Sequence, residues 1–368
     1  MALSQASHPT QARRDRVLVR ELLPIMMFVA FALFPIAATF GAEAYLIDLF
    51  RRIMIFAIAA LALDLLVGYG ALVSFGHAAF IGIGAYAVGI LAASNVSDMI
   101  ISLPLAIGAA ALFAYLTGTI CLRTRGVYFI MITLAFGQMA YFFAGSLAPY
   151  GGDDGLTLAM RSTLLGFAPF KHDLLFYYIV LGCLVGCYWL CRALVISRFG
   201  RVFRGARENP TRMAALGFDV FRYQLTAYTI SGALGGLAGF LLANATDFVS
   251  PAYMSWHRSG ELIVMIILGG IGNLNGAIVG TVAFLLLGEW LSDLTENWEM
   301  IFGPLLVVII LLARGGLLGL AAQMAAWYRR ENILSVGDFI AAVGRYLRQL
   351  ARRTIKSTLQ TSRSRSRG

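Results

Sequence analysis

The sequence predicts an all-α, polytopic membrane protein of about ten transmembrane helices, some of them interrupted around a central pathway. Of its 368 residues, 59% are hydrophobic and 13% are charged, whereas a soluble domain has about 25% charged residues. Several stretches of about 20 nearly uncharged residues are each long enough to cross a bilayer. A glycine-rich segment, residues 68–91, interrupts this apolar pattern. The composition therefore leaves little mass for any soluble domain.

The glycine-rich segment has the sequence GYGALVSFGHAAFIGIGAYAVGIL. It places six glycines, a serine and a histidine where a simple span would have leucines. Hydrocarbon does not tolerate unpaired backbone groups unless protein or a water-filled cavity covers them. We therefore expect a broken or tightly packed helix pair that lines a transport pathway, with Ser74, His77 and Tyr86 as candidate pathway residues. For His77, the alternative interpretation is burial against a neighbouring helix with a hydrogen bond to it.

Hydropathy predicts ten spans in the membrane domain, residues 22–313, between a basic N-terminal segment, 1–21, and a basic tail, 314–368. The apolar run after the basic N-terminal segment is too long for a cleaved signal peptide, so we interpret it as an uncleaved first helix. The predicted spans are roughly 22–42, 52–69, 75–94, 99–121, 126–147, 173–193, 223–246, 259–272, 276–293 and 299–313.

The placement of arginines predicts the orientation. With ten spans, both termini, the Arg123–Arg125 turn and the loop 197–222 fall on one side, which should be the cytoplasmic side of a bacterial inner membrane. Arg51 and Arg52 do not fit this scheme, because they fall on the opposite side, near Glu43 and Asp48. That opposite side otherwise receives acidic residues, namely Asp153, Asp154, Asp293, Glu296 and Glu299.

The tail accounts for most of the formal net charge of +10, with eleven basic residues against Glu331 and Asp338. Apolar residues recur there at three- and four-residue spacing, with arginines between them. This pattern predicts an amphipathic helix on anionic membrane lipids, followed by a disordered end. A nucleic-acid partner is not expected, because no folded domain presents the charge. The apolar positions are Val336, Phe339, Ile340, Val343, Tyr346, Leu347 and Leu350.

Three of the four cysteines, Cys183, Cys187 and Cys191, lie at four-residue spacing on one face of the sixth span. One helix face cannot close a tetrahedral metal site, and no histidine or carboxylate accompanies the row. We therefore predict that these cysteines are small packing residues, helped by Gly182 and Gly186, and that the chain has no metal site.

Other glycines occur at four-residue spacing in the later spans, as in Gly232/Gly236 and Gly235/Gly239, and predict close helix packing. The segment GGIGNLNGAIVG, residues 269–280, differs because Asn273 and Asn275 stand between close-set glycines. We interpret it as a second break and both asparagines as pathway candidates. A matching interruption in each half is typical of an internal repeat, but the two halves share too little sequence to establish one.

The longest loop on the arginine-rich side contains signals for a short helix, Pro210–Leu216. Asn209 suits the N-cap, Pro210 the first helical position, and Gly217 the position after the helix end. The predicted helix exposes Met213, Ala215 and Leu216 among arginines. A positive-inside loop needs no helix, so we interpret this one as a docking element.

The sequence resembles the LivM-type permeases of ATP-driven importers of branched-chain amino acids. The segment 68–91 is similar to their GY-G-LSLGHAAFFGIGAY motif, and RGVYFIMITLAFGQM, residues 125–139, is similar to the next family block. The loop 197–222, the following span and GGIGNLNGAIVG match later blocks in order, so that the resemblance covers most of residues 50–315. It places the family's coupling element on Arg207, Glu208, Ala214, Ala215 and Gly217.

The resemblance implies a type II importer fold and alternating access. A periplasmic solute-binding protein would deliver the solute to two permease subunits, this chain and a paralogue, while two ATP-binding subunits would contact the loops. This chain is not expected to be the enzyme, because it lacks a G-x-x-x-x-G-K-[ST] loop and has only two lysines, Lys171 and Lys356. ATP and magnesium would belong to the partners, and this chain would hold no cofactor.

Several alternatives stay open at this stage. Asp64 stands where such permeases commonly have a neutral polar residue, so urea or short amides remain possible solutes beside branched-chain amino acids. An ion-coupled secondary transporter would need intramembrane carboxylates, and Asp64 is a strong candidate, with Glu261 and Glu289 nearer span ends. A membrane enzyme would need a catalytic cluster, but the four histidines, His8, His77, His172 and His257, are scattered.

Overall fold

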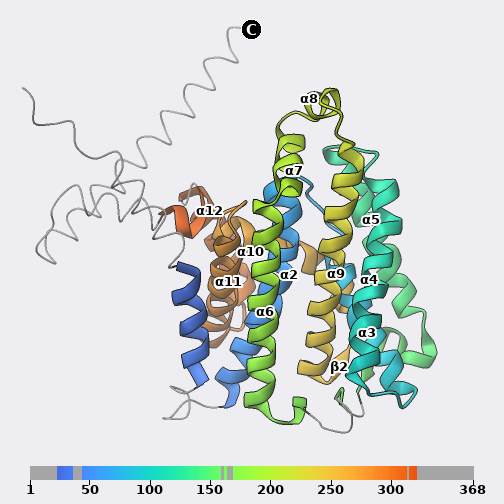
Figure 1. The fold of residues 1–368 in the computed structure, drawn as a ribbon. Coiled ribbons are helices and arrows are strands. Elements are labelled where there is room, and N and C mark those ends of the chain that lie inside the picture. The colour runs from blue at the N-terminus through green and yellow to red at the C-terminus, as the bar shows by residue number, and fades with distance from the viewer. Residues whose placement is uncertain (1–22, 36–43, 159–160, 164–168, 313–314, 321–368) are drawn as a thin grey trace, which may run out of the picture.

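The computed structural model describes residues 23–35, 44–158, 161–163, 169–312 and 315–320, and these are almost entirely helical. The predicted tail helix and N-terminal segment lie outside the described residues. Long helices form one bundle, with a two-stranded antiparallel pair and short 3-10 turns in the connections (Figure 1). The elements are an apolar helix Leu23–Pro35, α2 Ala44–Gly70, α3 His77–Ala93, α4 Met99–Cys121, α5 Val127–Gly145, α6 Asp173–Ile196, α7 Arg198–Glu208, α8 Pro210–Ala215, α9 Val220–Thr246, α10 Trp256–Gly269, α11 Leu274–Leu294, α12 Trp298–Leu312, η1 Ala148–Tyr150, η2 Gly152–Asp154, η3 Pro169–Lys171, η4 Pro251–Met254, β1 Leu156–Thr157 and β2 Phe248–Val249.

The chain is an all-α polytopic membrane protein. Six of the described helices, α2, α4, α5, α6, α9 and α11, are long and apolar enough to cross a bilayer. The other predicted spans fall on shorter helices, among them Leu23–Pro35 and α3. The count of ten crossings therefore stays a prediction.

Helix α2 is the centre of the bundle. Within its most apolar window, 94% of the residues are buried, against 22% for α4 and 28% for α5. It packs against α9, α6, α11, α10 and α7. The run from Ile53 to Leu66 is apolar on every face apart from Asp64, and a helix that is apolar all round is one that protein surrounds. The exposed apolar side chains of α4 and α5, such as Leu112 and Phe142, are suited to lipid.

Small residues bring α9 close to its neighbours, as their spacing predicts. A Cβ added at Gly232 would lie 2.3 Å from the Cβ of Ala114 in α4. On the other face, a Cβ at Gly239 would lie 1.9 Å from the carbonyl oxygen of Ile81 in α3. The prediction that Gly182 and Gly186 help α6 to pack is wrong, because no atom of a neighbouring element lies within 4 Å of an added Cβ at either glycine. Within the described chain these two glycines are therefore not packing positions.

The bundle has two ends, one marked by α8 and the other by β2 (Figure 1). At one end, which we call the α8 end, Thr124 and Arg125 lie beside Arg207 and Pro210. At the opposite end, the β2 end, Leu156 pairs with Val249, and Asp153 lies against the end of α5 at Gly145. The basic turn and loop thus share one end and Asp153 lies at the other, as the sequence predicts.

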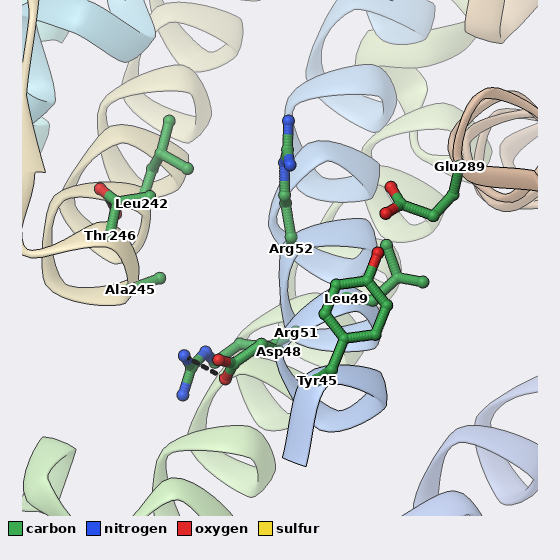
Figure 2. A pocket seen from close by; sticks show the side chains of 9 residues that line it. All are labelled: Tyr45, Asp48, Leu49, Arg51, Arg52, Leu242, Ala245, Thr246 and Glu289. Carbon is green, nitrogen blue, oxygen red and sulfur yellow. Dashed lines mark hydrogen bonds and ion pairs between the residues drawn. The ribbon is translucent and has the colours of Figure 1, made fainter. Parts of the chain in front are cut away.

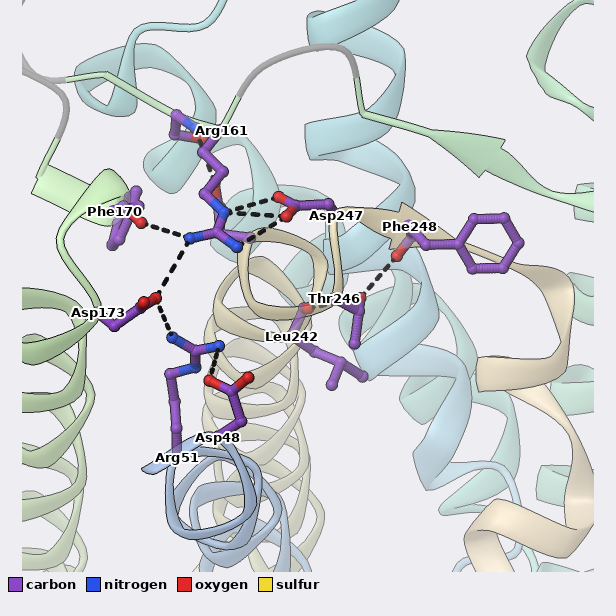
Figure 3. Close-up of polar contacts among 11 residues, drawn as sticks. Asp48, Arg51, Arg161, Phe170, Asp173, Leu242, Thr246, Asp247 and Phe248 are labelled. Atoms are coloured by element: carbon purple, nitrogen blue, oxygen red, sulfur yellow. Dashed lines mark hydrogen bonds and ion pairs between the residues drawn. The ribbon is translucent and has the colours of Figure 1, made fainter. Parts of the chain in front are cut away.

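Arg51 lies at the β2 end in an ion-pair network that sequence analysis missed (Figure 3). Its side chain is only 4% exposed and contacts Asp48 at 2.5 Å and Asp173 of α6 at 3.3 Å. Arg161 contacts Asp173 at 3.8 Å and Asp247 at 2.7 Å. The hydrogen bond from Arg161 to Asp247 raises the pKa of the guanidinium. Because Arg51 is neutralised by its neighbours, it has little effect on the charge balance of this end.

Candidate functional site

The first predicted break follows α2. The helix ends at Gly70, residues 71–76 have no regular secondary structure, and α3 begins at His77. Ala71 has φ of +55°, a conformation that is costly for a residue other than glycine and is typical of hinges and functional sites. A Cβ at Gly76 would lie 2.2 Å from the carbonyl oxygen of Thr133 in α5, so only glycine fits there.

The second predicted break separates α10 from α11 at residues 270–273. Gly270 and Gly272 have φ of +114° and +78°, which only glycine adopts readily. Asn273 caps α11, since its side-chain oxygen accepts the backbone N–H of Asn275 at 3.2 Å. The side-chain oxygen of Asn275 accepts a hydrogen bond from the Tyr188 hydroxyl at 2.8 Å. Both asparagines therefore have structural partners, which the pathway interpretation did not foresee.

The two breaks meet through Asp64. Its Oδ1 accepts the backbone N–H of Gly272 at 2.8 Å across 208 positions of sequence. The backbones are also in close contact, because a Cβ at Gly68 would lie 2.6 Å from the Cα of Gly272. Asp64 is fully buried in the last turns of α2, and its Oδ2 has no hydrogen-bond partner among the described residues. This carboxylate joins the ends of two interrupted helices.

Helix α7, which sequence analysis did not predict, reaches the same place. Its N-cap Ser197 accepts the backbone N–H of Gly200 at 3.3 Å. Arg207 near its other end donates a hydrogen bond to the carbonyl oxygen of Gly68. The ring of Phe203 covers Gly70 so closely that a Cβ there would lie 2.3 Å from its Cζ. We call this meeting point the junction and define it by Asp64, Gly68, Gly70, Phe203, Arg207 and Gly272.

Helix α8 has the local structure that the sequence predicts. Asn209 accepts the backbone N–H of Arg212 at 2.9 Å, Pro210 is the first helical residue, and Gly217 has φ of +86°. Glu208 is exposed, as are Ala214, Ala215 and Leu216. The prediction that Met213 is exposed is wrong, because its sulfur packs against Gly205 of α7 and the residue is only half-exposed. Helices α7 and α8 thus form one unit with an exposed apolar tip.

A cavity of about 210 Å³ lies beside the junction at the α8 end. The first break lines one side of it with Gly70, Ala71, Leu72 and Val73. Arg125, Arg207 and Pro210 from the neighbouring turn and helices line the rest, together with apolar residues of α5. The unit of α7 and α8 therefore borders the first break directly.

The remaining pathway candidates lie inside the subunit. Ser74 and His77 are fully buried, Tyr86 is 4% exposed, and none of them lines either of the two described cavities. The Tyr86 hydroxyl has no hydrogen-bond partner among the described residues. The His77 ring faces the backbone of Ala59 in α2, and the Ser74 hydroxyl faces the hydroxyl of Tyr228 in α9, but neither pair has good hydrogen-bond geometry. Buried polar groups are normally well paired, so weak pairing along one stretch of chain requires an explanation.

Comparison with known proteins identifies the relatives of this architecture. A family model described as "Branched-chain amino acid transport system / permease component" matches residues 45–313. The Escherichia coli K12 protein "High-affinity branched-chain amino acid transport system permease protein LivM" is 28% identical over 316 residues, covering 80% of this chain and 74% of that protein. A protein of Methanocaldococcus jannaschii, "Probable branched-chain amino acid transport permease protein LivM", is 24% identical and 94% covered. The Salmonella typhimurium permease protein LivH is 30% identical over 127 residues, or 33% of this chain. Among solved structures, none matches significantly.

Proposed function

Because the chain belongs to the family of branched-chain amino acid transport system permease components, we propose that it is one of two permease subunits of an ATP-driven importer. It moves leucine, isoleucine and valine by alternating access. Two separate ATP-binding subunits hydrolyse ATP with magnesium, and this chain itself binds neither ATP nor magnesium. A solute-binding protein delivers the solute from the periplasm. The existence of both LivM and LivH relatives supports a paralogue as the second permease.

We further propose that the membrane domain, 22–313, crosses the bacterial inner membrane ten times with both termini in the cytoplasm. The α8 end then faces the cytoplasm, which agrees with its arginines. The basic tail, 314–368, lies on membrane lipids.

The junction is the observation on which this proposal depends most. In an importer, movement of the ATP-binding subunits has to change the shape of the pathway. The exposed tip of α8, with Ala214, Ala215 and Gly217, is the surface that these subunits contact. Arg207 and Phe203 pass the movement to the end of α2, and Asp64 passes it on to the second break. A ligand-driven switch requires such a two-state element, and a helix end between two glycine breaks can serve as one.

Reconstitution of the chain with its partner subunits in vesicles tests the proposal. We expect ATP-dependent uptake of leucine, isoleucine and valine that requires both permeases and the binding protein. Uptake of urea or acetamide without uptake of leucine would overturn the proposal that the solutes are branched-chain amino acids. Uptake driven by an ion gradient without ATP would overturn the class of transporter.

Gly217→Val is expected to uncouple the transporter while the subunit still inserts. Valine at φ of +86° is strained by about 1–2 kcal/mol or more, because its Cβ crowds the backbone. Glu208→Lys, which reverses a charge on the exposed end of α7, is expected to have the same effect. Solute-stimulated ATP hydrolysis is the measurement, and Gly217→Asn is the control because asparagine tolerates this conformation. Normal stimulation in both Gly217→Val and Glu208→Lys would contradict the assignment.

Asp64→Asn is expected to retain transport, because the amide oxygen can still accept the Gly272 N–H. Asp64→Leu removes that acceptor and leaves a buried N–H unpaired, which costs about 1–3 kcal/mol, so uptake is expected to fall by about tenfold. Uptake of each candidate solute, at equal subunit expression, distinguishes the outcomes. A loss in Asp64→Asn that is confined to amine-bearing solutes would show that the carboxylate selects a cationic group instead.

A cysteine at position 74 tests whether the buried polar groups face the pathway. In a background without the four native cysteines, we expect Ser74→Cys to react with a small water-soluble thiol reagent in one nucleotide state. Ser102→Cys is the matched control, since Ser102 is also buried but lies on α4. Protection of position 74 in every state would favour simple packing.

A further inference from the structure

Two adjacent arginines of α2 have different environments near the β2 end. Arg51 is buried in the ion-pair network, with contacts to Asp48 and Asp173. Arg52 is exposed and borders a separate cavity of about 170 Å³ (Figure 2). Helix α9 contributes Leu242, Ala245 and Thr246 to this cavity, and α11 contributes Glu289. We call it the Arg52 cavity.

Arg52 forms no ion pair or hydrogen bond with any described residue within the cavity or beside it. Arg258 and Glu261 of α10 lie near enough to interact electrostatically with its guanidinium. However, Glu261 already contacts Arg258 at 2.7 Å, so that pair adds little net charge. An arginine without a partner in a membrane-spanning helix is expensive, and by default it marks a functional site. The guanidinium therefore has free donors for an anionic group.

Glu289 supplies the opposite charge. It is half-buried on α11, and among the described residues its carboxylate has no ion pair or hydrogen bond. Figure 2 shows its carboxylate turned toward the side of the cavity where Arg52 and Tyr45 lie. The two charged groups border one cavity without reaching each other, because no contact of 4 Å or less joins them. A molecule with one negative and one positive group could contact both.

The remaining lining restricts the size and polarity of such a molecule. Leu49, Leu242 and Ala245 form apolar walls. The cavity of about 170 Å³ has room for about six water molecules at ~30 Å³ each, which suits a small solute. Asp48 also lines the cavity, but it is engaged by Arg51 at 2.5 Å.

We propose that the Arg52 cavity is an entry site for a zwitterionic α-amino acid, in which Arg52 binds the α-carboxylate and Glu289 binds the α-ammonium group. The apolar walls then receive the aliphatic side chain. The proposal rests on the import function, since it places the site at the β2 end, where the solute would arrive. It makes Arg52 and Glu289 binding residues and leaves Arg51 a structural one.

The test is protection of a cysteine inside the cavity. The assembled transporter carries Ala245→Cys in a background without native cysteines, and the rate of its modification by a small water-soluble thiol reagent is measured in nanodiscs. If leucine binds with a Kd of about 1 mM, then about 10 mM leucine should slow modification roughly tenfold. Leucinamide, which lacks the carboxylate, and 4-methylpentanoate, which lacks the amine, should give little protection.

Charge-neutral variants identify the two binding groups. Arg52→Gln and Glu289→Gln should each remove the protection by leucine, while Glu296→Gln should keep it, because Glu296 is exposed beyond the end of α11. Intact assembly of each variant is checked by size-exclusion chromatography. If a glutamine variant fails to assemble, Arg52→Lys and Glu289→Asp replace it and should weaken the protection.

Each other outcome overturns the site. Absence of protection by leucine would overturn it even when the parent transporter imports leucine, so its failure is distinct from failure of the import function. Equal protection by leucine and 4-methylpentanoate would remove Glu289 from the site. A modification rate that depends on anionic lipid in the nanodisc but not on leucine would show that Arg52 binds a lipid headgroup instead.

Discussion

Replacing Arg207 with alanine is expected to reduce solute-stimulated ATP hydrolysis in the assembled transporter by about tenfold or more while the subunit remains inserted. Arg207 donates to the carbonyl oxygen of Gly68, in the last turn of α2, where carbonyl groups have no intrahelical partner. A positive charge at the end of a helix is also favoured by its dipole. A hydrogen bond to a charged group contributes about 1.5–3 kcal/mol, so its loss should reduce coupling by about tenfold or more.

Arg201→Ala is the matched control for this experiment. Arg201 lies on the same helix, is exposed, and its side chain forms no ion pair or hydrogen bond with the described residues. The two variants remove the same charge from α7, so a general electrostatic effect on the loop would affect both. If Arg207→Ala stimulated hydrolysis as well as Arg201→Ala does, the junction would not transmit the movement of the loop.

Replacing Gly239 with valine is expected to prevent the subunit from folding. A Cβ at this position would lie 1.9 Å from the carbonyl oxygen of Ile81 and 2.9 Å from the backbone nitrogen of Ala85. Both obstacles are backbone atoms of α3, which cannot move aside as a side chain could. Overpacking of a core costs about 1–3 kcal/mol even where side chains can adjust, and a backbone clash should cost more. Natural proteins have only about 5–15 kcal/mol of stability in total.

Gly108→Val provides the comparison, because nothing lies within 4 Å of a Cβ added to Gly108 in α4. We expect this variant to resemble the parent in expression and in thermal stability, measured by fluorescence-detected size-exclusion chromatography. Gly239→Val should appear only as aggregate or be degraded. A monodisperse peak with an unchanged melting temperature for Gly239→Val would refute the close contact between α9 and α3.

Features that depend on neighbouring residues were predictable from the sequence. Asn209, Pro210 and Gly217 define the start and end of α8 because capping and a left-handed turn are properties of a few adjacent residues. Both helix breaks were predictable for a similar reason, since glycines and polar residues interrupt the apolar pattern where only special backbone conformations fit. The class of protein followed from composition alone.

Features that join distant parts of the chain were decided only by the tertiary structure. Asp64 was conspicuous as a carboxylate in a span, but nothing in the sequence pointed to Gly272, which is 208 positions away. Arg51 did not fit the predicted placement of arginines on one side of the membrane, and only the structure showed that Asp173 of α6 pairs with it. Arg207 had no assigned contact before the structure placed it on Gly68.

The physical reason is that the bilayer imposes the same local requirements on every membrane-spanning helix. Hydrocarbon requires each span to pair its own backbone groups, and this can be recognised within about 20 residues. It provides no hydrophobic driving force between helices, so their arrangement follows from close packing and a few polar contacts. Composition and local patterns therefore determined that this chain crosses the membrane, where its helices break and where its loop forms a capped helix. Only the tertiary structure decided that α2 lies at the centre, that α7 contacts the end of α2, and that Asp64 joins this end to the second break.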